Sequence, residues 1–177
     1  VGDVDSDGDL DIFVANFGFP NLSGNRVYLN DGSGVFTDSG QSLGDHESRH
    51  LEMGDLDGDG DLDVVVANDG GEGDRIWLND GNGNFTQGDV FGGTNSEDVG
   101  LGDFDADGDL DLYVVNNRTS ILKDAPDAAM FQLRIVNGEP QAPPQYRDRY
   151  QPMRIDGALT LVEFGEPDIV YLNDGAG

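Results

Sequence analysis

Three nine-residue segments of this chain repeat one acidic pattern, with aspartate at every odd position, glycine at the sixth and leucine at the eighth. They run from Asp3 to Asp11, from Asp55 to Asp63 and from Asp103 to Asp111, so their starts lie 52 and 48 residues apart. Self-similarity at a fixed period of this order is the mark of a repeat architecture. The sequence therefore predicts about three copies of one structural unit.

A second segment recurs with a similar period and ends in a turn signal. It runs from Arg26 to Gly34 and from Arg75 to Gly83, 49 residues apart, and again from Ile169 to Gly177; each copy contains Leu-Asn-Asp-Gly. Asp-Gly after alternating apolar residues is typical of a tight β-hairpin, because type I′ turns need residues that tolerate positive φ. Two markers with matching periods support the same repeat.

Short apolar runs follow each acidic segment, at residues 12–15, 64–67 and 112–115. They are rich in β-branched residues, too short for helices, and soon followed by Asn, so they are interpreted as strands buried on both faces. No stretch has the spacing of an amphipathic helix. The predicted fold class is all-β, with short antiparallel strands in every repeat.

Five carboxylates within nine residues repel one another strongly, by about 4 kcal/mol for two unit charges about 4 Å apart at an effective dielectric of about 20. A divalent cation removes that cost, and alternate oxygen donors around a glycine-containing turn suit Ca²⁺. We predict one calcium ion per loop, three in all. The predicted side-chain ligands are Asp3, Asp5, Asp7 and Asp11; Asp55, Asp57, Asp59 and Asp63; and Asp103, Asp105, Asp107 and Asp111, while Asp9, Asp61 and Asp109 are predicted to bind through backbone carbonyls.

The same pattern places two other residue types. Gly8, Gly60 and Gly108 are expected in left-handed or similarly open backbone geometry, and Leu10, Leu62 and Leu110 are expected to point into the blade.

An EF-hand shares the Asp-x-Asp-x-Asp-Gly opening but needs a bidentate Glu at position 12 and a following helix. Position 12 here is Val14, Val66 or Val114, and this lack of a glutamate excludes an EF-hand. Magnesium suits an all-protein carboxylate site less well, and plain solvated turns would not explain three matching copies.

Residues 47–68 and 75–85 resemble FG-GAP/VCBS-type repeats, the blade units of calcium-binding β-propellers and similar in design to the integrin α-chain head. The resemblance covers roughly residues 1–117 and 166–177, with Ala15-Asn16 and its equivalents where the integrin form has Gly-Ala-Pro. It implies a partial propeller: repeat 1 at about residues 1–50, repeat 2 at about 51–98 and repeat 3 at about 99–177. Because propellers typically close with four to eight blades, we expect the remaining blades of a longer polypeptide, or a second copy, to complete the ring.

The third repeat is interrupted by an insertion at about residues 118–165, which holds five of the seven prolines and six of the nine basic residues. We expect strands near 131–136 and 158–162 around a proline-rich loop, Pro140 to Pro152. Long insertions on rigid scaffolds often carry function. Tyr146, Arg147, Arg149 and Tyr150 form a candidate surface for a protein or glycan ligand, although a purely structural insertion explains them equally well.

Charge limits the partners further. The net charge of −27 argues against nucleic acid, and no apolar run is long enough to insert in a membrane. Cysteine is absent, so no thiolate chemistry is available. His46 and His50 lie four residues apart, but two imidazoles make an incomplete metal or catalytic set.

These observations lead to one functional hypothesis and one alternative. The chain is expected to be an extracellular or cell-surface recognition or adhesion module, with the periplasm as a further location, because weak calcium sites fill only at millimolar calcium. The alternative is the propeller scaffold of a secreted carbohydrate-active enzyme such as a polysaccharide lyase. No nucleophile and base pair stands out, so the sequence favours a non-enzymatic role.

Overall fold

The structure, a computed structural model, describes residues 1–18, 24–92, 95–116, 134–136, 139–141, 150–155, 158–163 and 168–173. Every regular element in these residues is a β-strand, which confirms the predicted all-β class. None of the described residues forms a helix long and apolar enough to cross a membrane.

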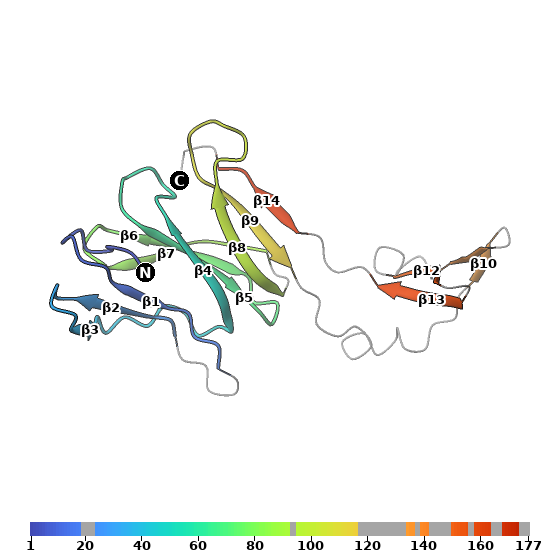
Figure 1. Ribbon diagram of the computed structural model, residues 1–177, viewed down its shortest axis with the longest axis horizontal. Helices are drawn as coiled ribbons and strands as arrows, with labels where there is room; N and C mark the ends of the chain where they lie inside the picture. The colour runs from blue at the N-terminus through green and yellow to red at the C-terminus, as the bar shows by residue number, and fades with distance from the viewer. Residues whose placement is uncertain are drawn as a thin grey trace. The chain divides into compact units, whose positions relative to one another are not determined.

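The central sheet is a four-stranded antiparallel meander (Figure 1). Its strands follow one another in the order of the chain: β4 (Ser48–Gly54), β5 (Asp63–Asn68), β6 (Asp74–Asn79) and β7 (Phe85–Phe91). The acidic loop joins β4 to β5, and the Asp-Gly turn joins β6 to β7. In a meander the first and third connections lie at one end of the sheet and the second at the other, so both repeated markers lie at the same end.

Two three-stranded sheets repeat this plan. One contains β1 (Ile12–Val14), β2 (Arg26–Asn30) and β3 (Phe36–Asp38), with an isolated bridge between Gly2 and Asp11 in the place of a first strand. The other has the order β14-β9-β8, from strands β8 (Ser96–Gly102), β9 (Asp111–Asn116) and β14 (Ile169–Tyr171). We call the sheets blades 1, 2 and 3 in chain order, blade 2 being the central one. The acidic loops of blades 2 and 3 project from the same end (Figure 1).

Apolar layers lie between the blades. Val64, Val66 and Trp77 of blade 2 cluster with Val4, Phe13 and Val27 of blade 1, while Val65 and Ala67 cluster with Leu112 and Val114 of blade 3. Successive residues of a strand point to opposite faces, so the uninterrupted apolar run in β5 serves two neighbours at once. All six residues of β5 are buried, which confirms the prediction of a strand covered on both faces.

Two of the three leucines of the acidic loops, Leu62 and Leu110, lie between blades, which corrects the expectation that they point into their own blade. A methyl group added at Gly2 would lie 2.7 Å from Leu62 Cδ1, and one added at Gly54 would lie 2.7 Å from Leu110 Cδ1. Each leucine therefore packs on a glycine of the preceding blade. Leu10 has no such neighbour and is exposed. A single strand pattern could not reveal this, because the contact depends on how two repeats pack.

A side-chain amide links each pair of neighbouring blades. The Nδ2 atom of Asn79 donates to the carbonyl of Val4 in blade 1 at 2.8 Å and to that of Leu62 in its own loop at 3.2 Å. Asn173 repeats the pattern toward Leu56 at 2.9 Å and Leu110 at 3.3 Å. The Asn of the Leu-Asn-Asp-Gly marker is thus an inter-blade connector.

Replacing Asn79 by Ala should lower the free energy of unfolding by about 2 kcal/mol, because two carbonyls in a buried joint lose their donor. The matched control is Asn30→Ala in blade 1. Asn30 is half-buried and its Nδ2 donates to Leu10 O at 3.1 Å, so the expected loss is below about 1 kcal/mol. Urea unfolding of both variants checks the difference, and equal losses would contradict the connector role.

Residues Asn117–Pro167 form a compact unit of their own, separate from the unit of Val1–Asn116 and Asp168–Gly177. The described strands in it are β10 (Arg134–Val136), β11 (Glu139–Gln141), β12 (Tyr150–Ile155) and β13 (Ala158–Glu163), paired as two antiparallel ribbons. Pro140 and Pro152 lie within β11 and β12, where we expected a loop. A two-stranded ribbon consists of edge strands, and an edge accepts proline where its missing N–H would face outward.

Candidate metal sites

The last aspartate of each acidic loop is buried and receives two backbone hydrogen bonds. Asp63 accepts from the amide of Leu56 at 2.9 Å through Oδ2 and from that of Asn79 at 2.8 Å through Oδ1. The equivalent carboxylates of Asp11 and Asp111 accept from the same two positions of their own repeats. Each ties the acidic loop to the strand that carries the marker asparagine. A carboxylate oxygen has two lone pairs, so these oxygens keep capacity for a cation.

The first aspartate closes the turn. Asp3 accepts hydrogen bonds from the amides of Asp7 at 3.1 Å and Gly8 at 3.0 Å. Asp103 accepts from the same two positions of its loop, whereas Asp55 accepts from the amides of Gly58 and Gly60. Gly8, Gly60 and Gly108 have φ of 96°, 96° and 104°, which confirms the open geometry predicted for the sixth position.

Positive φ also occurs at the fourth position of the loop, which the sequence analysis missed. Ser6 has φ of 59°, Gly58 78° and Ala106 66°. Left-handed backbone costs a residue with a Cβ about 1–2 kcal/mol. Gly58, at this position of the second loop, was the one residue in the sequence that indicated a positive φ here. The loop conformation is thus maintained in two copies at the expense of local strain.

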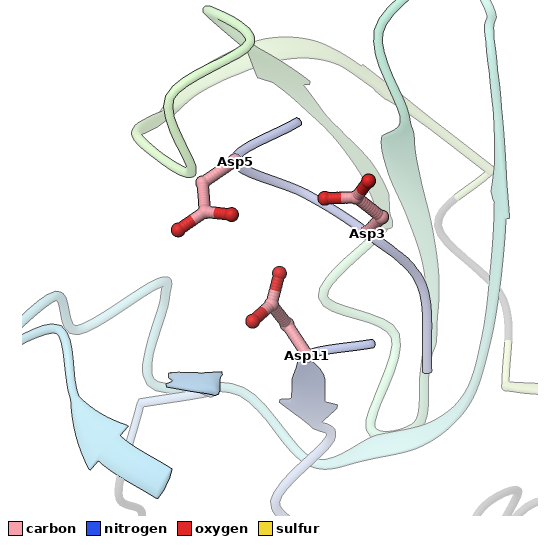
Figure 2. A group of neighbouring side chains, drawn as sticks. All are labelled: Asp3, Asp5 and Asp11. Atoms are coloured by element: carbon pink, nitrogen blue, oxygen red, sulfur yellow. The ribbon is translucent and has the colours of Figure 1, made fainter. Parts of the chain in front are cut away.

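Three of the five aspartates in each loop come together. The groups are Asp3, Asp5 and Asp11; Asp55, Asp57 and Asp63; and Asp103, Asp105 and Asp111, each with one oxygen per residue within 4.8 Å of the others. Figure 2 shows the carboxylates of the first group turned toward one common space, with Asp11 directly before β1.

The other two predicted ligands lie outside these groups. The side chain of Asp7 accepts from the amide of Asp9 at 3.0 Å, and Asp59 and Asp107 do the same for Asp61 and Asp109. The carboxylate of Asp9 lies against the hairpin turn at Gly32, as that of Asp61 lies against Gly81. The side chains at the fifth and seventh positions thus contact the loop itself and the neighbouring hairpin. The seventh residue was predicted to bind through its backbone carbonyl, and the ligand roles of both positions stay predictions.

The residues present fit a hard cation. Oδ1 of Asp5 is buried and receives no hydrogen bond from the described residues. Burial, and after it the charges of Asp11 and Asp7, raises the pKa of Asp5. Loss of hydration, and then the charges of Asp107 and Asp111, raises the pKa of Asp105 in the third loop. A cluster of carboxylate oxygens that includes a buried oxygen without a hydrogen-bond donor among the described residues is the donor chemistry that Ca²⁺ satisfies.

A second polar network lies at the opposite end of the blades. The fully buried carboxylate of Asp74 accepts from the amide of Asn68 at 2.8 Å and from the hydroxyl of Ser96 in blade 3 at 2.8 Å. Asn25 and Asp168 occupy the same position in blades 1 and 3, where they accept from the amides of Asn16 and Asn116. Sequence reasoning missed this network, because its polar residues vary between repeats.

Burial raises the pKa of Asp74, and its hydrogen bonds with Asn68 and Ser96 offset part of that rise. The folded chain therefore holds this proton to a higher pH than the unfolded chain, whose carboxyl titrates near 3.8. As the pH rises from the carboxyl pKa of the unfolded chain through that of the folded chain, ionisation of Asp74 lowers the free energy of unfolding. The loss persists at neutral pH.

Asp74→Asn should then be stabilising relative to the wild type at pH 7, and its advantage should shrink toward pH 4. The amide keeps an acceptor for Asn68 and gains a donor for Ser96. Urea unfolding of both proteins from pH 4 to pH 7 measures this difference, and an advantage that grows on acidification would overturn the assignment.

The histidines pair with carboxylates. His46 Nδ1 lies 2.8 Å from Glu72 Oε2, and His50 Nδ1 lies 2.6 Å from Asp98 Oδ1. Neither belongs to a group of three or more potential metal ligands among the described residues. Trp77 is buried in the layer between blades 1 and 2. Tyr146, Arg147 and Arg149 lie outside the described residues, and of Tyr150 only the backbone is described, in β12.

Comparison with known families agrees with the geometry. The model of the FG-GAP-like repeat matches residues 3–66 and 55–114, so two overlapping matches cover the first two acidic loops, the third loop and the strand that follows it. No curated protein and no solved structure matches the chain. Matches spanning more than half of the sequence, together with three blades that present equivalent acidic loops, show that the chain belongs to the FG-GAP-like repeat family.

Proposed function

We propose that this chain is an extracellular calcium-stabilised β-propeller module that recognises a protein or glycan ligand. The observation that carries the calcium assignment is the convergence of the same three carboxylates in all three loops. Each loop would hold one ion through its first, third and ninth residues, and the ion would supply the positive charge that offsets mutual repulsion. Calcium would thereby hold the loop against the strand on which the marker asparagine lies.

The proposed location follows from affinity. A site in a short, solvent-accessible loop fills at millimolar rather than submicromolar calcium, and such concentrations occur outside the cytosol. Of the three groups, two are half-exposed apart from the buried ninth residue, and the third is more exposed still. These are the properties of structural ions in extracellular modules rather than of cytosolic sensors.

The proposed binding surface is the unit at residues 117–167. In the chain it takes the place of the connection between the second and third strands of blade 3. In blade 2 the same connection consists of residues 69–73. An insertion of this length at a turn leaves the metal loops and the apolar layers unchanged, which suits a ligand-binding element on a rigid scaffold.

Calcium titration by isothermal calorimetry tests the metal assignment, with three ions per chain as the expected result. Asp57→Asn should remove one ion, because Asp57 belongs to the second group. Asp59→Asn is the matched control: it makes the same change of charge in the same loop at a residue outside the group, and should leave three. Loss of an ion from the control, with none lost from Asp57→Asn, would refute the assignment.

A glycan array, probed with and without calcium, tests recognition. The intact chain should bind, and deletion of residues 119–165 should abolish binding while calcium stoichiometry stays at three. The alternative, a carbohydrate-active enzyme, predicts release of shorter saccharides from the bound polysaccharide. Binding without turnover supports the recognition module, and turnover that survives purification to homogeneity supports the enzyme.

A further inference from the structure

Asp74 of blade 2 meets blade 3 through a buried hydroxyl that faces two oxygen atoms. Oγ of Ser96 lies 2.8 Å from Asp74 Oδ2 and 3.1 Å from Asn116 Oδ1, and all three residues are buried. A serine hydroxyl has one hydrogen to donate, and an ionised carboxylate has none. Both contacts can be hydrogen bonds at the same time only if Asp74 carries a proton and donates it to Ser96.

The equivalent pair in blade 2 supports the orientation of the Asn116 amide. Asn68 accepts from the Ser48 hydroxyl at 2.9 Å through Oδ1 and donates to the carbonyl of Gly73 at 2.8 Å through Nδ2. These two bonds fix which end of the Asn68 amide is the oxygen. Asn116 presents Oδ1 to Ser96 in the same way, so the atom that faces this hydroxyl is an acceptor.

Blade 1 has a neutral side chain in the place of Asp74. Asn25 accepts from the amide of Asn16 at 2.8 Å through Oδ1, as Asp74 accepts from that of Asn68. The other terminal atom of Asn25 is an amide nitrogen, which donates, whereas that of Asp74 is Oδ2. A protonated Asp74 therefore reproduces the donor of blade 1, and an ionised Asp74 replaces it by an acceptor.

The surroundings of Asp74 also favour the protonated form. A methyl group added at Gly92 would lie 2.9 Å from Oδ2, so the backbone lies close against this oxygen. Burial raises the pKa of Asp74, and the hydrogen bonds of Asn68 and Ser96 and the charge of Arg75 offset part of that rise. The acids that flank Asp74 and Ser96 in the chain pair with cations: Asp69 with Arg49, Glu72 with His46 and Glu97 with Arg49.

We propose that Asp74 is a proton-controlled latch between blades 2 and 3, in which the Ser96 hydroxyl changes the acceptor to which it donates. When Asp74 takes a proton from solvent, Oδ2 donates to Ser96, and Ser96 donates to Asn116. When Asp74 is ionised, it takes the Ser96 hydrogen and withdraws it from Asn116. The latch is therefore closed below the carboxyl pKa of the folded chain and opens as the pH rises through it.

The latch acts on the end of the strand pair that begins blade 3. Ser96 and Asn116 are directly opposite each other, at the first residue of β8 and the last of β9. The backbone amide of Asn116 donates to Oδ1 of Asp168 at 3.0 Å, and Oδ2 of Asp168 accepts from the Tyr113 hydroxyl at 2.6 Å. Hydrogen bonds thus run without interruption from the buried acid of blade 2 to the residue before β14. Opening the latch should weaken this end of blade 3.

NMR of the full chain in 10 mM CaCl₂, from pH 4.5 to pH 8, tests the latch. The ¹³C shift of the Asp74 carboxyl locates its titration midpoint. Across that midpoint the hydrogen-exchange protection factor of the Asn116 amide should fall about fivefold as the pH rises, the change expected for loss of one hydrogen bond. The equivalent amide of Asn16 is the internal control and should stay constant, because its partner Asn25 does not titrate. The pKa of Asp168 is lowered by the Tyr113 hydroxyl and the Asn116 amide, so Asp168 stays ionised throughout.

Three variants assign the response to the latch. Asp74→Asn should remove it, because the new amide donates to Ser96 at every pH; this variant keeps both histidines, so a response that came from histidine would persist. Ser96→Ala should remove it by cutting the link to Asn116. Ser48→Ala makes the same change in the joint between blades 1 and 2 and should leave the response intact.

Several results would overturn the proposal. They are an Asp74 carboxyl that has finished titrating below pH 4.5, an Asn116 protection factor that is constant across the midpoint, a response that persists in Asp74→Asn, and a response that Ser48→Ala removes as completely as Ser96→Ala. Circular dichroism melts in calcium verify that each variant is folded. Asp74→Asn is expected to be more stable than the wild type, so the comparison stays decisive even if Ser96→Ala fails to fold.

Discussion

Excess EGTA will lower the melting temperature of the calcium-loaded chain by about 10 °C. A ligand that binds only the folded state stabilises it by RT ln(1 + [L]/Kd), which is about 1.4 kcal/mol per site at about 1 mM calcium and a Kd of about 0.1 mM. Three sites contribute about 4 kcal/mol, a large part of the roughly 5–15 kcal/mol that holds a typical domain folded. For a unit of this size, 1 kcal/mol corresponds to about 3 °C.

Scanning calorimetry in calcium, in EGTA and in EGTA with calcium restored measures this effect. Magnesium at the same concentration is the control, and it should restore little of the lost stability because it prefers a small octahedral shell that keeps several waters. An unchanged melting curve in EGTA would end the proposal that calcium stabilises the blades.

Replacing Asp63 by Ala will cost about 4–6 kcal/mol in calcium. The carboxylate is fully buried and accepts hydrogen bonds from the amides of Leu56 and Asn79. Without it two amides lose their acceptor, at about 1–3 kcal/mol each, and the second calcium site is lost as well, at about 1.4 kcal/mol. The variant should be largely unfolded at 37 °C.

Two comparisons separate these contributions. Asp63→Asn keeps one acceptor and should fall between the wild type and the alanine variant. Asp59→Ala removes a carboxylate from the same loop but outside the group, and should cost less than about 1 kcal/mol. In EGTA the cost of Asp63→Ala should shrink by the calcium contribution alone. Equal effects of the Asp59 and Asp63 substitutions would show that burial and backbone contacts do not set the cost.

The sequence predicted the parts of this molecule that each repeat determines locally. Aspartate at alternate positions, glycine at the sixth and a β-branched run after the ninth were enough to predict an acidic turn entering a buried strand. The positive φ at Gly60 and the full burial of Val64 and Val65 follow from that local pattern. Repetition three times made the prediction of blades secure.

The remaining features depend on contacts between repeats, which no single repeat encodes. The amide of Asn79 reaches Val4, 75 residues away, and Leu62 packs on Gly2. Within the loops, the side chain of Asp7 accepts from the amide of Asp9, and the carboxylate of Asp9 lies beside Gly32 of the neighbouring hairpin. An alternating pattern contains no information on which of these side chains converge.

The position of the unit at residues 117–167 has an evolutionary consequence. Its two junctions, Asn116 and Asp168, are joined by a hydrogen bond of 3.0 Å from the amide of Asn116 to Oδ1 of Asp168. The blade thus fastens both junctions together whatever the length of chain between them. A segment inserted between these two residues therefore lowers the stability of the blade only slightly, because the entropy cost of loop closure grows slowly with length. This position is where a designer would graft a new binding peptide, and where natural variants of this chain are expected to diverge fastest.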